Sequence, residues 1–218
     1  RSMLFSELGL SEPVLKAVEK CGYEHPTPIQ EQAIPPALAG RDVLGCAQTG
    51  TGKTCAFASP ILQRLSAART PDHRLRALIL TPTRELAIQI RDELRDLCAF
   101  KEGVRSVCLY GGQPIDKQIT QLKKRPQIVV ATPGRLMDHV KRRTLRLDKV
   151  ETVVLDEADR MLDMGFIRDV TRILDLMPQR RNLGLFSATI SREVMDISWV
   201  YQRDPVEITV RADEQNKP

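Results

Sequence analysis

The stretch from Asp42 to Thr54, which reads DVLGCAQTGTGKT, decides the fold. A short apolar run ends at Cys46 and is followed by a glycine-rich loop and then by a helical pattern. Glycines let the backbone curl so that its N–H groups point inward at phosphate oxygens, and the N-terminus of the next helix adds positive potential. This order of strand, glycine-rich loop and helix predicts a phosphate-binding loop (P-loop) in an α/β domain.

Two residues at the end of this loop carry its chemistry. We expect Lys53 to reach the β- and γ-phosphates of a nucleotide and the Thr54 hydroxyl to ligate Mg²⁺. The strict pattern has glycine where Ala47 stands, so the match is to a relaxed form, and chance matches occur in unrelated proteins. The predicted nucleotide-binding residues of the loop are Ala47, Gln48, Thr49, Gly50, Thr51, Gly52, Lys53 and Thr54.

Apolar runs alternate with amphipathic stretches along the chain. Several runs are almost entirely apolar, which is typical of strands buried on both faces of a parallel sheet. Residues 83–100, 165–177 and 191–201 repeat apolar side chains at helical spacing. The alternation predicts an α/β fold with a mostly parallel central sheet flanked by helices. The predicted strands are Asp42–Cys46, Ala77–Leu80, Val104–Tyr110, Ile128–Ala131, Thr152–Leu155, Leu183–Phe186 and Val206–Val210.

The first 40 residues differ from the rest. Ser11 followed by Glu12-Pro13 predicts the start of one helix, and Pro26-Thr27-Pro28 predicts the start of a second. Because both helices precede the first strand, we expect residues 1–41 to form a helical extension packed on the core. The core domain is then expected to span residues 42–212, and the polar residues 213–218 are expected to begin a linker.

The composition excludes several classes of protein. The chain has 218 residues and a formal net charge of +5, which favours an anionic partner, although a solvated surface explains so small a surplus equally well. No apolar stretch approaches the roughly 18–20 residues of a membrane span, so no membrane association is expected. Aromatic residues make up only 4%, which argues against a base-stacking platform. Five cysteines without a C-x-x-C pair argue against zinc and disulfides and for a reducing, cytoplasmic location.

A second motif lies at Asp156–Asp159, directly after the apolar run Thr152–Leu155. A buried strand that ends in acidic residues places carboxylates at the carboxyl edge of the sheet, where open α/β sheets bind ligands. One carboxylate there can hold Mg²⁺ while its neighbour orients an attacking water. The alternative is a helix N-terminus that merely carries acids. With Lys53 and Thr54 upstream, the pattern favours a nucleotide hydrolase.

The letters of this motif, Asp-Glu-Ala-Asp, name the DEAD-box RNA helicase family, and the chain resembles the N-terminal RecA-like domain of that family, in its compact bacterial type. Further motifs follow in the family's order and span most of the chain. Residues 22–30 resemble its Q motif, with the isolated aromatic Phe5 upstream. The others are Pro82–Ala87, Gly111-Gly112, Thr132–Arg135 and Ser187–Thr189.

The resemblance implies that the nucleotide is ATP, bound with Mg²⁺. It adds Phe5, Tyr23, His25 and Gln30 to the predicted ATP site. The Gln30 carboxamide has one acceptor and two donors, the complement of an adenine edge. Tyr23 is expected to stack on the base, unless it is a half-buried core aromatic. His25 stands where the family often carries Lys or Arg, so its charge is weaker.

The resemblance also implies roles in catalysis. Asp156 would hold Mg²⁺, partly through water, and Glu157 would position the attacking water. Asp159, Ser187 and Thr189 would link the nucleotide site to RNA, and with Lys53 they complete the predicted catalytic set. For Ser187 and Thr189 the alternative is a turn whose hydroxyls bond locally.

A third set of residues resembles the family's contacts to the RNA backbone. Arginines and hydroxyls bind phosphate, and glycines let a strand approach backbone N–H groups, so RNA binding is expected to be independent of sequence and sensitive to salt. Taken singly, the glycine pair could be a plain turn and the Thr-Pro-Gly segment a plain helix start. The predicted RNA-binding residues are Pro82, Thr83, Arg84, Gly111, Gly112, Thr132, Pro133, Gly134 and Arg135.

Members of this family close two RecA-like domains over ATP and RNA, and the present sequence resembles the first. The resemblance predicts ATP hydrolysis coupled to local separation of an RNA duplex. An arginine finger from the second domain contributes about 10³–10⁵ in rate, so the 218-residue chain is expected to bind nucleotide but to hydrolyse it poorly. Three alternatives remain: a DNA helicase or translocase, an RNA clamp without turnover, and an interaction module with a decayed site. The context of Gln30 argues against the first, and the intact Lys53, Asp156 and Glu157 argue against the others.

Overall fold

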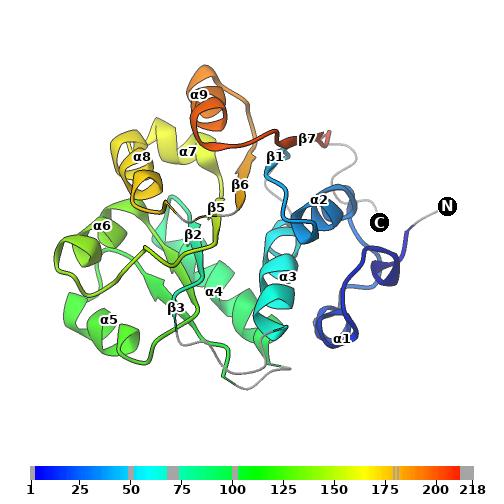
Figure 1. Cartoon of the computed structure of the whole chain (residues 1–218), viewed down its shortest axis with the longest axis horizontal. Helices are drawn as coiled ribbons and strands as arrows, with labels where there is room; N and C mark the ends of the chain where they lie inside the picture. Colours follow the sequence, from blue (N-terminus) through cyan, green and yellow to red (C-terminus); the bar gives the residue numbers. More distant parts are fainter. Residues whose placement is uncertain are drawn as a thin grey trace.

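The computed structural model describes residues 3–48, 52–67, 74–99, 103–178, 180 and 182–211. Within these ranges seven parallel strands form one sheet in the order β3-β4-β2-β5-β6-β1-β7. Helices cover both faces of this sheet (Figure 1). The strands are β1 (Val43–Cys46), β2 (Ala77–Leu80), β3 (Ser106–Leu109), β4 (Ile128–Ala131), β5 (Thr152–Leu155), β6 (Asn182–Ser187) and β7 (Val206–Thr209).

All seven strands lie where the apolar runs predict them, with ends that differ by at most two residues, so the predicted α/β fold is confirmed. One short 3₁₀ helix and nine α-helices accompany them in the described part of the chain. They are η1 (Phe5–Glu7), α1 (Glu12–Lys20), α2 (Pro28–Leu38), α3 (Lys53–Ser66), α4 (Arg84–Cys98), α5 (Ile115–Leu122), α6 (Pro133–Lys141), α7 (Ala158–Asp163), α8 (Ile167–Asp175) and α9 (Arg192–Tyr201).

The core has two layers because successive residues of a strand point to opposite faces of the sheet. Ile79 of β2 belongs to the cluster that includes residues of α1–α4, whereas its neighbours Leu78 and Leu80 belong to the cluster that includes residues of α5–α9. All three side chains are buried. The nearly continuous apolar runs in the sequence follow from this burial on both faces.

The N-terminal helices α1 and α2 pack against α3, and α1 also contacts α4. Phe5 is buried and meets the ring of Tyr23 edge to face, with 6.3 Å between ring centroids. These contacts join residues 5–38 to the same apolar cluster as the sheet. The proposed boundary at residue 41 stays a prediction, and residues 213–218 lie outside the described ranges.

The order of the strands determines which loops meet. β6 lies between β5 and β1, so the residues that follow β1, β5 and β6 share one part of the carboxyl edge of the sheet. The residues that follow β3, β4 and β2 share the neighbouring part. Across the described residues, no helix combines the length and the apolar character needed to cross a membrane.

Candidate functional site

Three charged side chains form the centre of the site. Lys53 opens α3, and its Nζ lies 2.9 Å from Oδ1 of Asp156 and 4.0 Å from Oε2 of Glu157. The three residues are only 8%, 2% and 4% exposed. Burial raises the pKa of the Asp156 carboxyl, and the Lys53 ammonium opposes that rise. A phosphate that enters this cluster would therefore compete with Asp156 for the Lys53 charge.

Asp156 has a second partner that the sequence analysis missed. The fully buried Thr81 hydroxyl donates to Oδ2 of Asp156 across 3.3 Å. Thr81 follows β2, the neighbour of β5 in the sheet, so both residues leave the sheet at the same level. A polar residue directly after an apolar run is the signal that the sequence offers for Thr81, whereas the pairing of β2 with β5 is visible only in the structure.

Glu157 has an unusual backbone conformation. Its φ of 51° and ψ of 52° place it in the left-handed region, where residues other than glycine are uncommon and such strain concentrates at functional sites. One of its carboxylate oxygens accepts a hydrogen bond of 3.0 Å from Nη1 of Arg160, a residue that the sequence analysis did not anticipate. The sharp turn and the arginine together fix the direction of the Glu157 side chain.

Asp159 and the segment Ser187–Thr189 are joined directly. Oδ2 of Asp159 accepts from both the backbone N–H and the hydroxyl of Thr189, at 3.2 and 3.1 Å. The Ser187 hydroxyl accepts from the backbone N–H of Asp159 and donates to the carbonyl of Thr189. The structure therefore brings together the residues for which the sequence implied a link. Whether that link transmits RNA binding stays a prediction.

Gln30 contacts the phosphate loop. It is fully buried, its Oε1 accepts from the backbone N–H of Thr27, and its Nε2 donates 3.0 Å to the carbonyl of Gly52. One N–H of the amide and one lone pair remain for an adenine edge. Gly52 has a φ of 91°, and a Cβ there would collide with the Gln30 amide, so only glycine fits.

The other predicted ATP-binding residues differ in accessibility. Tyr23 is half-buried, and burial raises the pKa of its hydroxyl, whereas His25 is exposed and Phe5 is buried behind Tyr23. Ala47 is buried and Gln48 exposed after β1. Thr49, Gly50 and Thr51 lie outside the described residues.

Thr54, the predicted Mg²⁺ ligand, lies near a carboxylate on α4 that the sequence did not suggest. Burial raises the pKa of this carboxylate, Glu93, and the Thr54 side chain opposes that rise. The oxygens of Thr54, Asp156 and Glu157 are the hard ligands that Mg²⁺ prefers, so the residues present fit that ion.

The residues predicted to bind RNA follow three adjacent strands. Pro82–Arg84 follow β2, Gly111-Gly112 follow β3, and Thr132–Gly134 follow β4 and open α6. The guanidinium of Arg84 lies 5.4 Å from the centroid of the Tyr110 ring, which fixes its position above the end of β3. These residues therefore share one edge of the sheet, beside the nucleotide cluster.

Arg135 is an exception, because its guanidinium binds the protein itself. Nη1 donates 2.8 Å to the carbonyl of Gln113 and 3.3 Å to Oε1 of Gln118, and Nε lies 3.7 Å from a carboxylate oxygen of Asp138. The side chain is only 16% exposed. An RNA contact by Arg135 stays a prediction. The structure itself shows that Arg135, at the start of α6 after β4, binds the loop that follows β3, so it joins the loops after β3 and β4.

Gln118 and His139 form a buried network behind these loops, and no motif in the sequence indicates it. Nε2 of Gln118 donates 2.8 Å to the carbonyl of Tyr110, and its Oε1 lies 2.8 Å from Nε2 of His139. Nδ1 of His139 lies 2.8 Å from the Thr144 hydroxyl. Burial lowers the pKa of His139, as does the charge of Arg135. The lowered pKa favours the neutral imidazole, in which Nε2 donates to Oε1 of Gln118 and Nδ1 accepts from the Thr144 hydroxyl.

A parallel sheet in this order, with a lysine and two carboxylates buried at its carboxyl edge, defines a RecA-like nucleotide-binding domain. Residues 27–197 match the family described as DEAD/DEAH box helicase. The chain belongs to that family.

Known proteins support this assignment. The chain is 50% identical over 212 residues to "ATP-dependent RNA helicase CshA" of Limosilactobacillus reuteri. The aligned region covers 97% of this chain and 42% of that protein. It is 49% identical to the "DEAD-box ATP-dependent RNA helicase CshA" of Geobacillus kaustophilus, and the aligned region covers 98% of this chain and 45% of that protein. The chain thus spans less than half the length of these relatives.

Solved structures agree. A DEAD box protein from the hyperthermophile Methanococcus jannaschii superposes with a TM-score of 0.89 at 42% identity, over 97% of this chain and 57% of that one. A hypothetical ATP-dependent RNA helicase from Sulfolobus tokodaii gives a TM-score of 0.84 at 36% identity, over 92% of this chain and 57% of that one.

Proposed function

We propose that this chain is the ATP-binding half of an ATP-dependent RNA helicase that couples ATP hydrolysis to binding of single-stranded RNA and local separation of a duplex. The observation that carries the proposal is the buried cluster of Lys53, Asp156 and Glu157. Buried charges are costly and are kept where chemistry needs them. The names of the relatives supply the nucleotide and the substrate class.

The residues of the cluster take separate roles in hydrolysis. Lys53 leaves Asp156 to bind the β- and γ-phosphates, which brings its charge onto the oxygens that gain negative charge in the transition state. Thr54 and Asp156 would hold Mg²⁺, partly through water, and that ion would neutralise phosphate charge. Glu157, fixed by Arg160, orients the attacking water.

ATP is favoured over other nucleotides by Gln30. Its remaining donor and acceptor suit the adenine edge, and Tyr23 offers a flat ring for the base. Because Gln30 also donates a hydrogen bond to the carbonyl of Gly52, a base bound at Gln30 would act directly on the position of the phosphate loop. This contact supports a role in sensing the bound nucleotide as well as in selecting it.

RNA would lie across the ends of β2, β3 and β4. Arg84, Gly111, Gly112 and Thr132 offer a guanidinium, two glycine backbones and a hydroxyl, which suit phosphates and carry no base code. The hydrogen bonds between Asp159 and Thr189 would connect the nucleotide cluster to the end of β6. We expect RNA and the second RecA-like domain to contact the chain near that end. That domain, in the longer protein, would complete the site.

The test is RNA-stimulated ATP hydrolysis by a two-domain form of the protein. We expect turnover that rises with single-stranded RNA and falls about 10²–10⁴-fold in Glu157→Gln, with RNA binding retained. The 218-residue chain alone should hydrolyse ATP about 10³–10⁵-fold more slowly, because the arginine finger of this family is expected from the second RecA-like domain. Stimulation by DNA alone would indicate a DNA translocase, and RNA binding without turnover would indicate a clamp.

A further inference from the structure

A groove of about 720 Å³ lies at the amino end of β3, the edge strand of the sheet. It is bounded by the last turn of α4, the start of β3 and the segment after α5. Because parallel strands all point the same way, this groove lies at the end of the sheet opposite to the nucleotide cluster. The residues that line it include Arg91, Arg95, Arg105, Lys124 and Pro126.

The lining is strongly basic. It has four cations, and none of its described residues is acidic. Asp92, beside the groove, lies 3.0 Å from Nε of Arg91 and 4.0 Å from Nη2 of Arg95, so one carboxylate is shared by two guanidinium groups. Arg105 donates to the backbone carbonyl of Lys124, which brings another pair of cations together. Such a concentration of like charge attracts an anionic ligand.

A second basic groove of about 430 Å³ begins on the other side of Pro126. Among the residues that the structure describes, the two grooves are lined by eight cationic side chains and one acidic one, a surplus of seven charges. That surplus exceeds the +5 of the whole chain, so the other residues of the chain together are net acidic. The basic character of this protein is therefore concentrated here. The second groove's charged residues are Arg74, Arg125, Arg146, Asp148 and Lys149.

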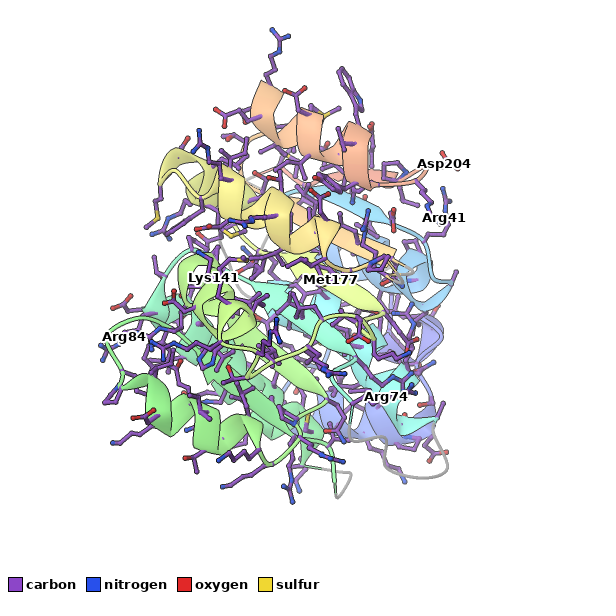
Figure 2. All side chains as sticks on the ribbon, turned by 60° about the vertical axis from the view of Figure 1, so that its left-hand side comes forward. Arg41, Arg74, Arg84, Lys141, Met177 and Asp204 are labelled. Atoms are coloured by element: carbon purple, nitrogen blue, oxygen red, sulfur yellow. The ribbon has the colours of Figure 1, made fainter. Side chains whose placement is uncertain are left out.

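Helix α4 connects the groove to the predicted RNA edge. Arg84, Arg91 and Arg95 are spaced by seven and four residues, so they lie on one face of the helix. Eleven residues at 1.5 Å each place Arg95 about 16 Å below Arg84, the length of about five stacked nucleotides. In Figure 2, Arg84 lies at one side of the molecule, and Arg74, which lines the second groove, lies toward the other side.

We propose that the groove of Arg91, Arg95, Arg105 and Lys124, here called the lower groove, binds the phosphate backbone of RNA that extends beyond the segment at the carboxyl edge. The inference rests on the proposed function. The described lining residues include no aromatic ring, so they would contact phosphates and not stack bases, and binding would be independent of sequence. The described lining also includes no aromatic anchor of the kind that dominates protein interfaces, which favours RNA over an acidic protein.

The test compares single-stranded RNA of about 6 and about 20 nucleotides, since one such site takes on the order of 4–16 nucleotides. Fluorescence anisotropy of the 218-residue chain measures the affinity for each at about 50 mM and about 200 mM salt. The lower groove is altered by Arg95→Glu with Lys124→Glu. A matched control reverses the exposed pair Arg168 and Arg172 on α8, on the other face of the sheet.

We expect the groove variant to bind the long RNA about tenfold more weakly while the short RNA is unaffected. The slope of log affinity against log salt for the long RNA should flatten by about 1.4, because two phosphate contacts are lost. The milder pair Arg95→Gln with Lys124→Gln should lose less affinity in the same direction, which separates loss of contact from added repulsion. Melting curves verify that each variant is folded.

Several outcomes would overturn the lower groove as an RNA site. These are an unchanged affinity for long RNA, an equal loss on the short RNA, or an equal loss in the α8 control. Competition by polyglutamate as effective as that by long RNA would indicate an acidic protein partner instead. The failure of the proposed function looks different: the short RNA would not bind, and the two-domain form would lack RNA-stimulated turnover, whatever the groove variants do.

Discussion

Two neighbouring parts of the carboxyl edge are held together by opposite chemistry. The nucleotide half, after β1, β5 and β6, is built on three buried charges, those of Lys53, Asp156 and Glu157. The half that we propose to bind RNA, after β3 and β4, is called the RNA half here, and it is built on a neutral network of Gln118 and His139. Both clusters are almost completely buried, so the difference is not one of exposure.

The difference suits the work of each half. Opposite charges in a buried cluster can exchange partners, so an entering phosphate can take Lys53 from Asp156 and leave an altered site behind. Amide and imidazole groups that already satisfy one another have no reason to move when RNA binds on the far side of the loops. We infer that the nucleotide half is the part that switches and that the RNA half is the part that stays rigid.

The largest expected effect comes from removing the central cation. Lys53→Met leaves two carboxylates buried together, which should lower the free energy of unfolding by about 3–5 kcal/mol near pH 8 and abolish nucleotide binding. Urea unfolding measures the first and nucleotide titration the second. Because the pKa of Asp156 is raised, the folded variant binds protons more tightly than the unfolded chain, so its stability should recover as the pH falls.

The control for this variant is the double substitution Lys53→Met with Asp156→Asn. It removes charge from both members of the pair and should recover most of the lost stability without recovering nucleotide binding. A single variant that loses under about 1 kcal/mol would show that the charges of the nucleotide half are better solvated than their burial indicates, and the comparison of the two halves would weaken.

The second effect tests the RNA half. Gln118→Ala leaves the carbonyl of Tyr110, Arg135 and His139 each without one partner, which should cost about 1–3 kcal/mol of stability. RNA affinity should fall because the two loops lose their common support, while nucleotide affinity stays unchanged. Thr120→Ala, at an exposed position on the same helix, should change stability by less than about 0.5 kcal/mol. Equal losses of RNA and nucleotide binding would mean that the halves are not separate.

The sequence predicted the fold because its signals were local. Each buried strand is an apolar run, and helix starts such as Thr83 are marked by side chains that cap the first turn, here by accepting from the backbone N–H of Leu86. Strand order was beyond reach, since long-range pairing leaves no trace in the spacing of one sequence. The two layers of the core and the adjacency of β5, β6 and β1 in the sheet are therefore visible only in the structure.

The site shows the same limit. The motif residues can be predicted from short sequence patterns. Such patterns do not indicate Thr81, Glu93 and Gln118, because each acts through a neighbour that is distant in sequence. Arg135 is predicted to contact RNA because it resembles a contact residue of the family, and that prediction stands untested, but its protein acceptors Gln113 and Gln118 could not be predicted. Packing decides which partner a polar side chain meets, and packing cannot be read from one sequence.

A smaller effect, dependent on pH, should come from His139. Burial lowers the pKa of His139 below 6.5. As the pH falls below about 6.5, His139 is therefore protonated in the unfolded chain while it stays neutral in the folded chain. The wild-type free energy of unfolding should therefore decline on acidification, by at most about 1.4 kcal/mol per pH unit, and His139→Gln should remove that part of the decline. Urea unfolding at about pH 8, 6.5 and 5 measures both proteins. Parallel pH dependence in the two proteins would show that folding leaves the pKa of His139 unchanged.

The smallest effect on stability is expected at the surface of the nucleotide half. Arg160 pairs with Glu157, but its side chain is 51% exposed, so water screens the pair and Arg160→Gln should change the free energy of unfolding by less than about 0.5 kcal/mol. Hydrolysis by the two-domain form should nevertheless fall several-fold, because Glu157 loses the contact that fixes its direction. Nucleotide affinity should remain, since Lys53 is untouched. A variant whose stability and turnover are both unchanged would show that the left-handed turn at Glu157 orients the carboxylate alone, and that the switching half needs no support beyond its buried charges.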